Sequence, residues 1–88
     1  MYNYEKEKPF LFTDEGQRMF LKVRDKTQSL MKLAGCARSQ EMISGNTGSS
    51  WSMLACVDRM VELKEIREIT NRNIVAGQHR VFVSNRED

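Results

Sequence analysis

Apolar residues recur between positions 14 and 34 at alternating steps of three and four, with polar residues between them. A stripe with this spacing lies on one side of an α-helix, so the pattern predicts a helix from about Asp14 to Ala34 with one buried face. Thr13 is the expected N-cap, and Gly35 is a residue that commonly ends a helix in a left-handed conformation. The stripe consists of Phe20, Val23, Thr27, Leu30 and Ala34.

Two further stretches have helical spacing, over residues 37 to 43 and 50 to 63. The turn GNTG separates them, and Ser49 or Ser50 is the expected N-cap of the second. We expect Phe20, Leu30, Val57 and Met60 to be buried together, because each lies on the apolar stripe of its helix. The methionines at 19, 31, 42, 53 and 60 are expected to fill the same core.

β-Branched and aromatic residues dominate positions 66 to 70 and 79 to 83, which predicts two strands. The stretch NRNIVAGQ between them suits a hairpin loop, so the strands should pair antiparallel. Residues 1 to 12 are expected to be an extended arm, because proline disfavours helix at the residue before it. The prediction is thus an α+β domain over residues 13 to 84, with a frayed tail at 85 to 88.

Composition and charge narrow the functional class. The 88 residues suffice for one small core, and 40% hydrophobic with 30% charged residues predicts a folded chain. A net charge of +2 and a pI near 8.7 allow a nucleic-acid partner without demanding one. The N-terminus lacks a signal-peptide pattern, and no stretch approaches the roughly 20 apolar residues of a membrane span, so we expect a cytoplasmic protein without a membrane partner.

Catalytic and metal-binding motifs are missing from the sequence. Cys36 and Cys56 form no CxxC pair, so we expect two reduced core thiols and no metal site. His79 has no second histidine to join it and is expected to be an ordinary strand residue. With no phosphate-binding glycine loop and no HExxH motif, we expect neither an enzyme nor a cofactor.

The stretch VDRMVELKEIREI resembles the end of the recognition helix and the first wing strand of the winged helix-turn-helix family. Many members read hydrophobic, Asp, Arg, Leu, then Gly, a residue, Ile and Arg. The matching positions are Val57, Asp58, Arg59, Met60, Ile66 and Arg67, and Lys64 stands where glycine is frequent. The resemblance covers residues 14 to 84 and implies three helices followed by a two-stranded wing, with residues 49 to 55 leading the recognition helix.

The proposed recognition helix begins without charge, since no charged side chain occurs from Met42 to Val57. Hydroxyls, amides and the positive end of a helix suit base edges and phosphates. Arginines of the wing and lysines 22, 26 and 32 of the first helix would neutralise phosphate. The candidate DNA-binding residues are Asn46, Thr47, Ser49, Ser50, Trp51, Ser52, Arg67, Arg72, His79 and Arg80.

Two functions remain open on this pattern. The first is a sequence-specific DNA-binding module, a small transcriptional regulator on double-stranded DNA, dimerising through residues 1 to 34. The alternative is a winged-helix protein-interaction module that does not bind DNA. Residues 36 to 66 carry a net negative charge, which repels DNA, and the polar turn could serve only to cap a helix. Trp51 is either a rim residue of the core or an exposed anchor for a partner.

Overall fold

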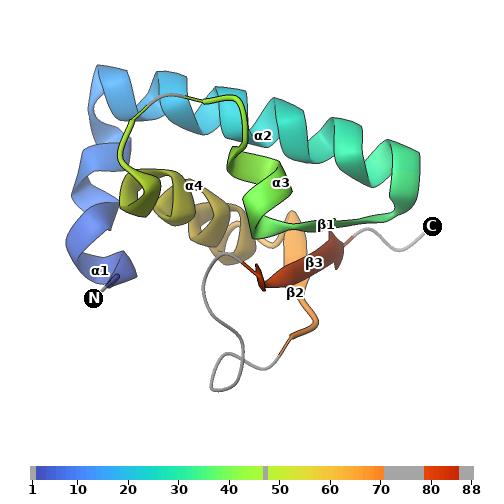
Figure 1. The fold of residues 1–88 in the computed structure, drawn as a ribbon. Helices are drawn as coiled ribbons and strands as arrows, with labels where there is room; N and C mark the ends of the chain where they lie inside the picture. Colours follow the sequence, from blue (N-terminus) through green and yellow to red (C-terminus); the bar gives the residue numbers. More distant parts are fainter. Residues whose placement is uncertain (1, 47, 71–78, 86–88) are drawn as a thin grey trace.

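The chain folds into an α+β domain with a three-stranded antiparallel sheet (Figure 1). The computed structural model describes residues 2–46, 48–70 and 79–85. In chain order the elements are α1 (Tyr4–Glu7), the 3-10 helix η1 (Lys8–Phe12), α2 (Asp14–Ala34), β1 (Cys36–Arg38), α3 (Ser39–Ile43), α4 (Ser50–Glu62), β2 (Ile66–Glu68) and β3 (Val81–Ser84). None of the helices in these ranges is long and apolar enough to cross a membrane.

Helix α2 begins and ends where the sequence predicts. The Thr13 hydroxyl accepts a hydrogen bond from the Gly16 amide at 3.0 Å, and Gly35 closes the helix with φ 75°. Val23 and Thr27 are fully buried, but Phe20 and Leu30 are half-buried and Ala34 is exposed. At 100° per residue, Phe20 and Leu30 fall on the two borders of the stripe, so both pack against the core half-buried and are not buried as Val57 and Met60 are.

The sheet has the order β1-β3-β2, and its first strand was not predicted. Cys36 pairs with Val83, and Ile66 pairs with Ser84, both antiparallel. The predicted pairing of the last two strands is confirmed, although β3 begins at Val81 and not at 79. Residues 71 to 78, the predicted hairpin loop, lie outside the described residues. Because β1 has three residues and becomes a strand only by pairing with β3, the sequence pattern placed its last two residues in a helix.

The core lies between α2, α4 and the inner face of the sheet. Val57, Met60 and Phe82 are buried to 1% exposure or less. The methionines are confirmed as core residues: 42, 53 and 60 are buried, and 19 and 31 pack half-buried against them. Both cysteines are free; Cys56 is buried as expected, but Cys36 is exposed, because β1 places it on the outer face of an edge strand.

The N-terminal residues do not form the expected extended arm. Asn3 caps α1 by accepting a hydrogen bond from the Lys6 amide at 3.3 Å, and η1 follows directly. Pro9 lies in the first turn of η1, where its missing N–H is not needed, and Leu11 is buried in the core. The contact with α2 is close: a Cβ on Gly16 would lie 1.9 Å from the carbonyl oxygen of Phe10.

Candidate nucleic-acid interface

The first turn of α4 presents its polar side chains to solvent. Ser49 takes the N-cap position in an extended conformation, yet its hydroxyl does not cap the helix. Ser50 is exposed, Trp51 is 44% exposed and Ser52 is half-buried. The hydroxyl of Ser49 is therefore not consumed by capping, which weakens the explanation of this turn as helix-start chemistry alone.

The polar turn before α4 packs on α2 and brings two cations beside an amide. A Cβ built on Gly48 would lie 2.7 Å from the Met19 Cε, which shows how closely the turn crosses that helix. A shallow groove runs between the two elements. It is lined by Glu15, Arg18, Met19 and Lys22 of α2 and by Gly45 and Asn46 of the turn. Thr47, also a predicted contact, lies outside the described residues.

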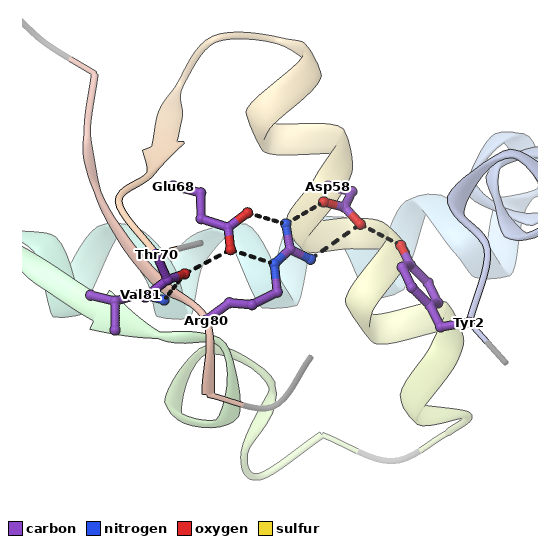
Figure 2. Close-up of polar contacts among 6 residues, drawn as sticks. All are labelled: Tyr2, Asp58, Glu68, Thr70, Arg80 and Val81. Carbon is purple, nitrogen blue, oxygen red and sulfur yellow. Dashed lines mark hydrogen bonds and ion pairs between the residues drawn. The ribbon is translucent and has the colours of Figure 1, made fainter. Parts of the chain in front are cut away.

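Arg80 is not placed to contact DNA, which corrects the sequence-based expectation. It is 5% exposed, and its Nη2 lies 2.8 Å from Asp58 Oδ1 and 2.9 Å from Glu68 Oε1 (Figure 2). Its guanidinium also covers the Phe82 ring, 4.9 Å from the centroid. Burial by itself lowers the pKa of Arg80, but hydrogen bonds to Glu68 and Asp58 outweigh it and hold the pKa above its usual value. This arginine fixes the base of the β2–β3 hairpin.

A polar network spreads from Arg80 to the N-terminal segment on one side and to the strands β2 and β3 on the other. Tyr2 donates from its hydroxyl to Asp58 Oδ2 at 2.6 Å, and Thr70 donates to Glu68 Oε2 at 2.7 Å while accepting from the Val81 amide (Figure 2). Burial and the hydrogen bond to Asp58 raise the pKa of Tyr2 above its usual range. Sequence reasoning missed this network. A carboxylate within the apolar run of α4 was the available signal, because a buried charge requires a partner.

The acidic residues near the end of α4 are paired within the chain. Glu62 accepts hydrogen bonds from Tyr4 at 2.9 Å, from Lys8 at 2.8 Å and from Arg59 at 2.6 Å. The Glu65 carboxylate lies 2.8 Å from the Arg24 Nε. The negative charge that the sequence set against DNA binding is thus largely neutralised by cations from the N-terminal segment, α2 and α4 itself.

Two other predicted contacts, Arg67 and His79, are exposed to solvent. Arg67 is exposed on β2, and His79 is exposed in a short turn before β3, not within a strand. Arg72 lies outside the described residues. The lysines at 22, 26 and 32 are exposed along α2. Among the described residues, no three His, Cys, Asp or Glu side chains converge on a point where a metal ion would sit.

Comparison with known proteins adds no relative. No family model matches the chain, and neither a curated protein nor a solved structure matches it.

Proposed function

We propose that this chain is a winged helix-turn-helix domain that binds double-stranded DNA sequence-specifically and serves as a small transcriptional regulator. The order of elements supports the proposal: α2, α3 and α4 are followed by the β2–β3 pair. The added strand β1 lies between the first two of these helices and extends the hairpin without disturbing that order. In this arrangement α4 is the recognition helix.

The observation that carries the proposal is the groove between α2 and the turn before α4. Its lining includes Arg18 and Lys22 together with Glu15 on α2, and Asn46 in the turn, a few residues ahead of an exposed and uncharged helix start. Cations of this kind neutralise phosphates, whereas an amide and hydroxyls exchange hydrogen bonds with base edges. The positive end of the α4 dipole adds a further attraction for a phosphate.

Replacing Arg18 by Gln tests whether the cations of the groove contact DNA phosphates. The variant should lose affinity for specific and random DNA alike, and the slope of log affinity against log salt should fall by about 1, as expected for one lost phosphate contact. Arg38→Gln is the matched control, because it removes one exposed positive charge on β1, outside the groove and outside the predicted contacts. Equal salt slopes for wild type and Arg18→Gln would remove the groove from the interface.

Replacing Ser50 or Ser52 by Ala tests whether the hydroxyls at the start of α4 contact base edges. Each change should reduce the difference in binding free energy between the preferred and a random DNA sequence by about 1 to 3 kcal/mol at most. The slope of log affinity against log salt should change little. Binding is measured by fluorescence anisotropy on labelled duplexes between about 50 and 200 mM salt, where electrostatic binding changes most. A wild-type protein without affinity for any duplex at about 50 mM salt would overturn the proposal.

Trp51 favours the second candidate, a protein-interaction module. It remains 44% exposed at the start of α4, and tryptophan is a frequent anchor of protein interfaces. If wild type binds no DNA, Trp51→Ala becomes the first variant to compare in a pull-down.

Dimerisation through residues 1 to 34 stays a prediction, checked by sedimentation across concentrations. Tyr2, Tyr4 and Phe10 pack against the core of their own chain.

A further inference from the structure

Helix α4 has two covered faces. Met53, Val57 and Met60 form the stripe that packs in the core. A second stripe, with steps of four, three and four, lies on the opposite side of the helix. It consists of Trp51, Ala55, Asp58 and Glu62. Its two ends are exposed, but Ala55 and Asp58 in the middle are 0% and 4% exposed.

The N-terminal segment covers this second stripe together with Arg80, whose guanidinium pairs with Asp58. Tyr2 donates to Asp58, and both Tyr4 and Lys8 donate to Glu62, at 2.6, 2.9 and 2.8 Å. In Figure 1, α2 runs above α4 and α1 lies to its lower left, and both helices contact α4. We call residues 2 to 8 the N-terminal cover.

The cover conflicts with the use of α4 as a recognition helix. A major groove is about 12 Å wide, and one helix with its side chains already measures about 10–12 Å across. A groove of that width has no room for a second layer of chain on the helix that enters it. With the cover in place, only the first turn of α4, residues 50 to 52, is open to base edges.

The cover is attached by hydrogen bonds from its side-chain tips and by half-buried packing of the Tyr2 and Tyr4 rings against the core. None of the residues of α1 is buried, and the cover is tethered to α4 by hydroxyl and ammonium groups on two carboxylates. Leu11, by contrast, is only 4% exposed and marks where the chain becomes part of the buried core. A helix of four residues does not persist alone in water, so an undocked cover would lose its helical hydrogen bonds.

We infer that the N-terminal cover is an autoinhibitory element that must leave the Asp58–Glu62 face of α4 before this helix enters a major groove. The inference rests on the proposed DNA-binding function and adds its regulation. The apparent DNA affinity is then the intrinsic affinity multiplied by the fraction of molecules in which the cover is open. Any change that opens the cover without removing a charge should therefore strengthen DNA binding.

The double variant Tyr2→Phe, Tyr4→Phe tests this, because it removes two tethers and leaves the net charge unchanged. Hydrogen bonds to charged acceptors are the stronger class, so opening should become at least about 10-fold more frequent. Amide exchange reports opening at Lys6 and Glu7, whose N–H groups bond to the Asn3 carbonyl. DNA affinity should rise by the same factor while exchange in α4 stays unchanged. Lys6→Gln, in the same segment, is the control that should leave exchange at Glu7 as in wild type.

Each outcome decides between the two proposals. Faster exchange with a matching gain in affinity supports the cover. Faster exchange with unchanged or weaker binding overturns it and leaves DNA binding standing, since the segment then does not block the interface. Unchanged exchange in the double variant also overturns it, because the hydroxyls would not hold the segment. If neither protein binds DNA, the proposed function fails and the autoinhibitory role fails with it.

Discussion

Asp58 and Arg80 form an ion pair in which both side chains are nearly inaccessible, with 2.8 Å between Oδ1 and Nη2. The pair joins the middle of α4 to the residue before β3, and Glu68 extends it to β2. Removing charges from water is costly, and mutual pairing with good hydrogen-bond geometry offsets that cost. The position of the hairpin relative to α4 therefore depends on a polar contact inside an otherwise apolar core.

Arg80→Met should lower the free energy of unfolding by about 3–5 kcal/mol, because Asp58 and Glu68 would stay buried without their guanidinium partner. Arg67→Met is the matched control: that arginine is exposed on β2, and its loss should cost no more than about 0.5 kcal/mol. Urea denaturation of the two variants measures the difference. Similar midpoints would mean that the buried pair contributes nothing to stability.

Phe82→Ala should destabilise the domain by about 3–5 kcal/mol, because its ring is fully buried at the centre of the sheet. Phe20→Ala removes the same atoms from a half-buried position and should cost clearly less, since less surface was withdrawn from water. Thermal or urea unfolding of both variants gives the comparison. A larger loss of stability for Phe20→Ala than for Phe82→Ala would place the centre of the core on α2.

Lys64 has φ 63°, and no other non-glycine residue in the described part of the chain has a positive φ. A left-handed conformation strains any residue with a Cβ, so Lys64→Gly should be more stable than Lys64→Ala by about 1 kcal/mol. The alanine variant removes the same charge and keeps the strain, which isolates the backbone effect. Identical unfolding midpoints for the two variants would show that the turn relaxes.

Glu62 should titrate well below an ordinary glutamate. Hydrogen bonds from Lys8, Arg59 and Tyr4 lower its pKa from 4.5 to about 2. Because the folded-state pKa is depressed, its stabilising effect is present above pH 4.5 and is lost as the pH falls towards 2. NMR titration of the side-chain carboxyl should give a midpoint near 2, and Lys8→Gln should raise it. A midpoint that stays the same in Lys8→Gln would contradict the pairing.

The two thiols should react at very different rates. Cys36 is exposed on β1, whereas Cys56 is fully buried in α4, where burial raises its pKa to about 12. The thiolate is the reactive form, so a thiol reagent at neutral pH should label one equivalent quickly and the second only on unfolding. Cys36→Ser should abolish the fast phase. Fast labelling of two equivalents in the folded protein would show that α4 opens locally.

Elements whose signals lie within a few neighbouring residues were predictable from the sequence. Helix α2 followed from its apolar spacing and from Thr13 and Gly35 at its ends. Helix α4 and the pairing of β2 with β3 followed from periodicity and β-branched residues in the same way. Positions at the centre of a stripe, such as Val57 and Met60, were assigned correctly because their burial follows from helical geometry.

Features that depend on partners distant in the chain could not be predicted from local pattern. Cys36–Arg38 became a strand because β3 supplies its hydrogen bonds, and residues 4 to 12 became helical where they dock on α2 and α4. Arg80, expected on the surface, is buried because Asp58 and Glu68 together compensate its charge. Local propensity carries no information about such partners, since an ion pair or a strand ladder gains its free energy only after the chain has brought both sides together.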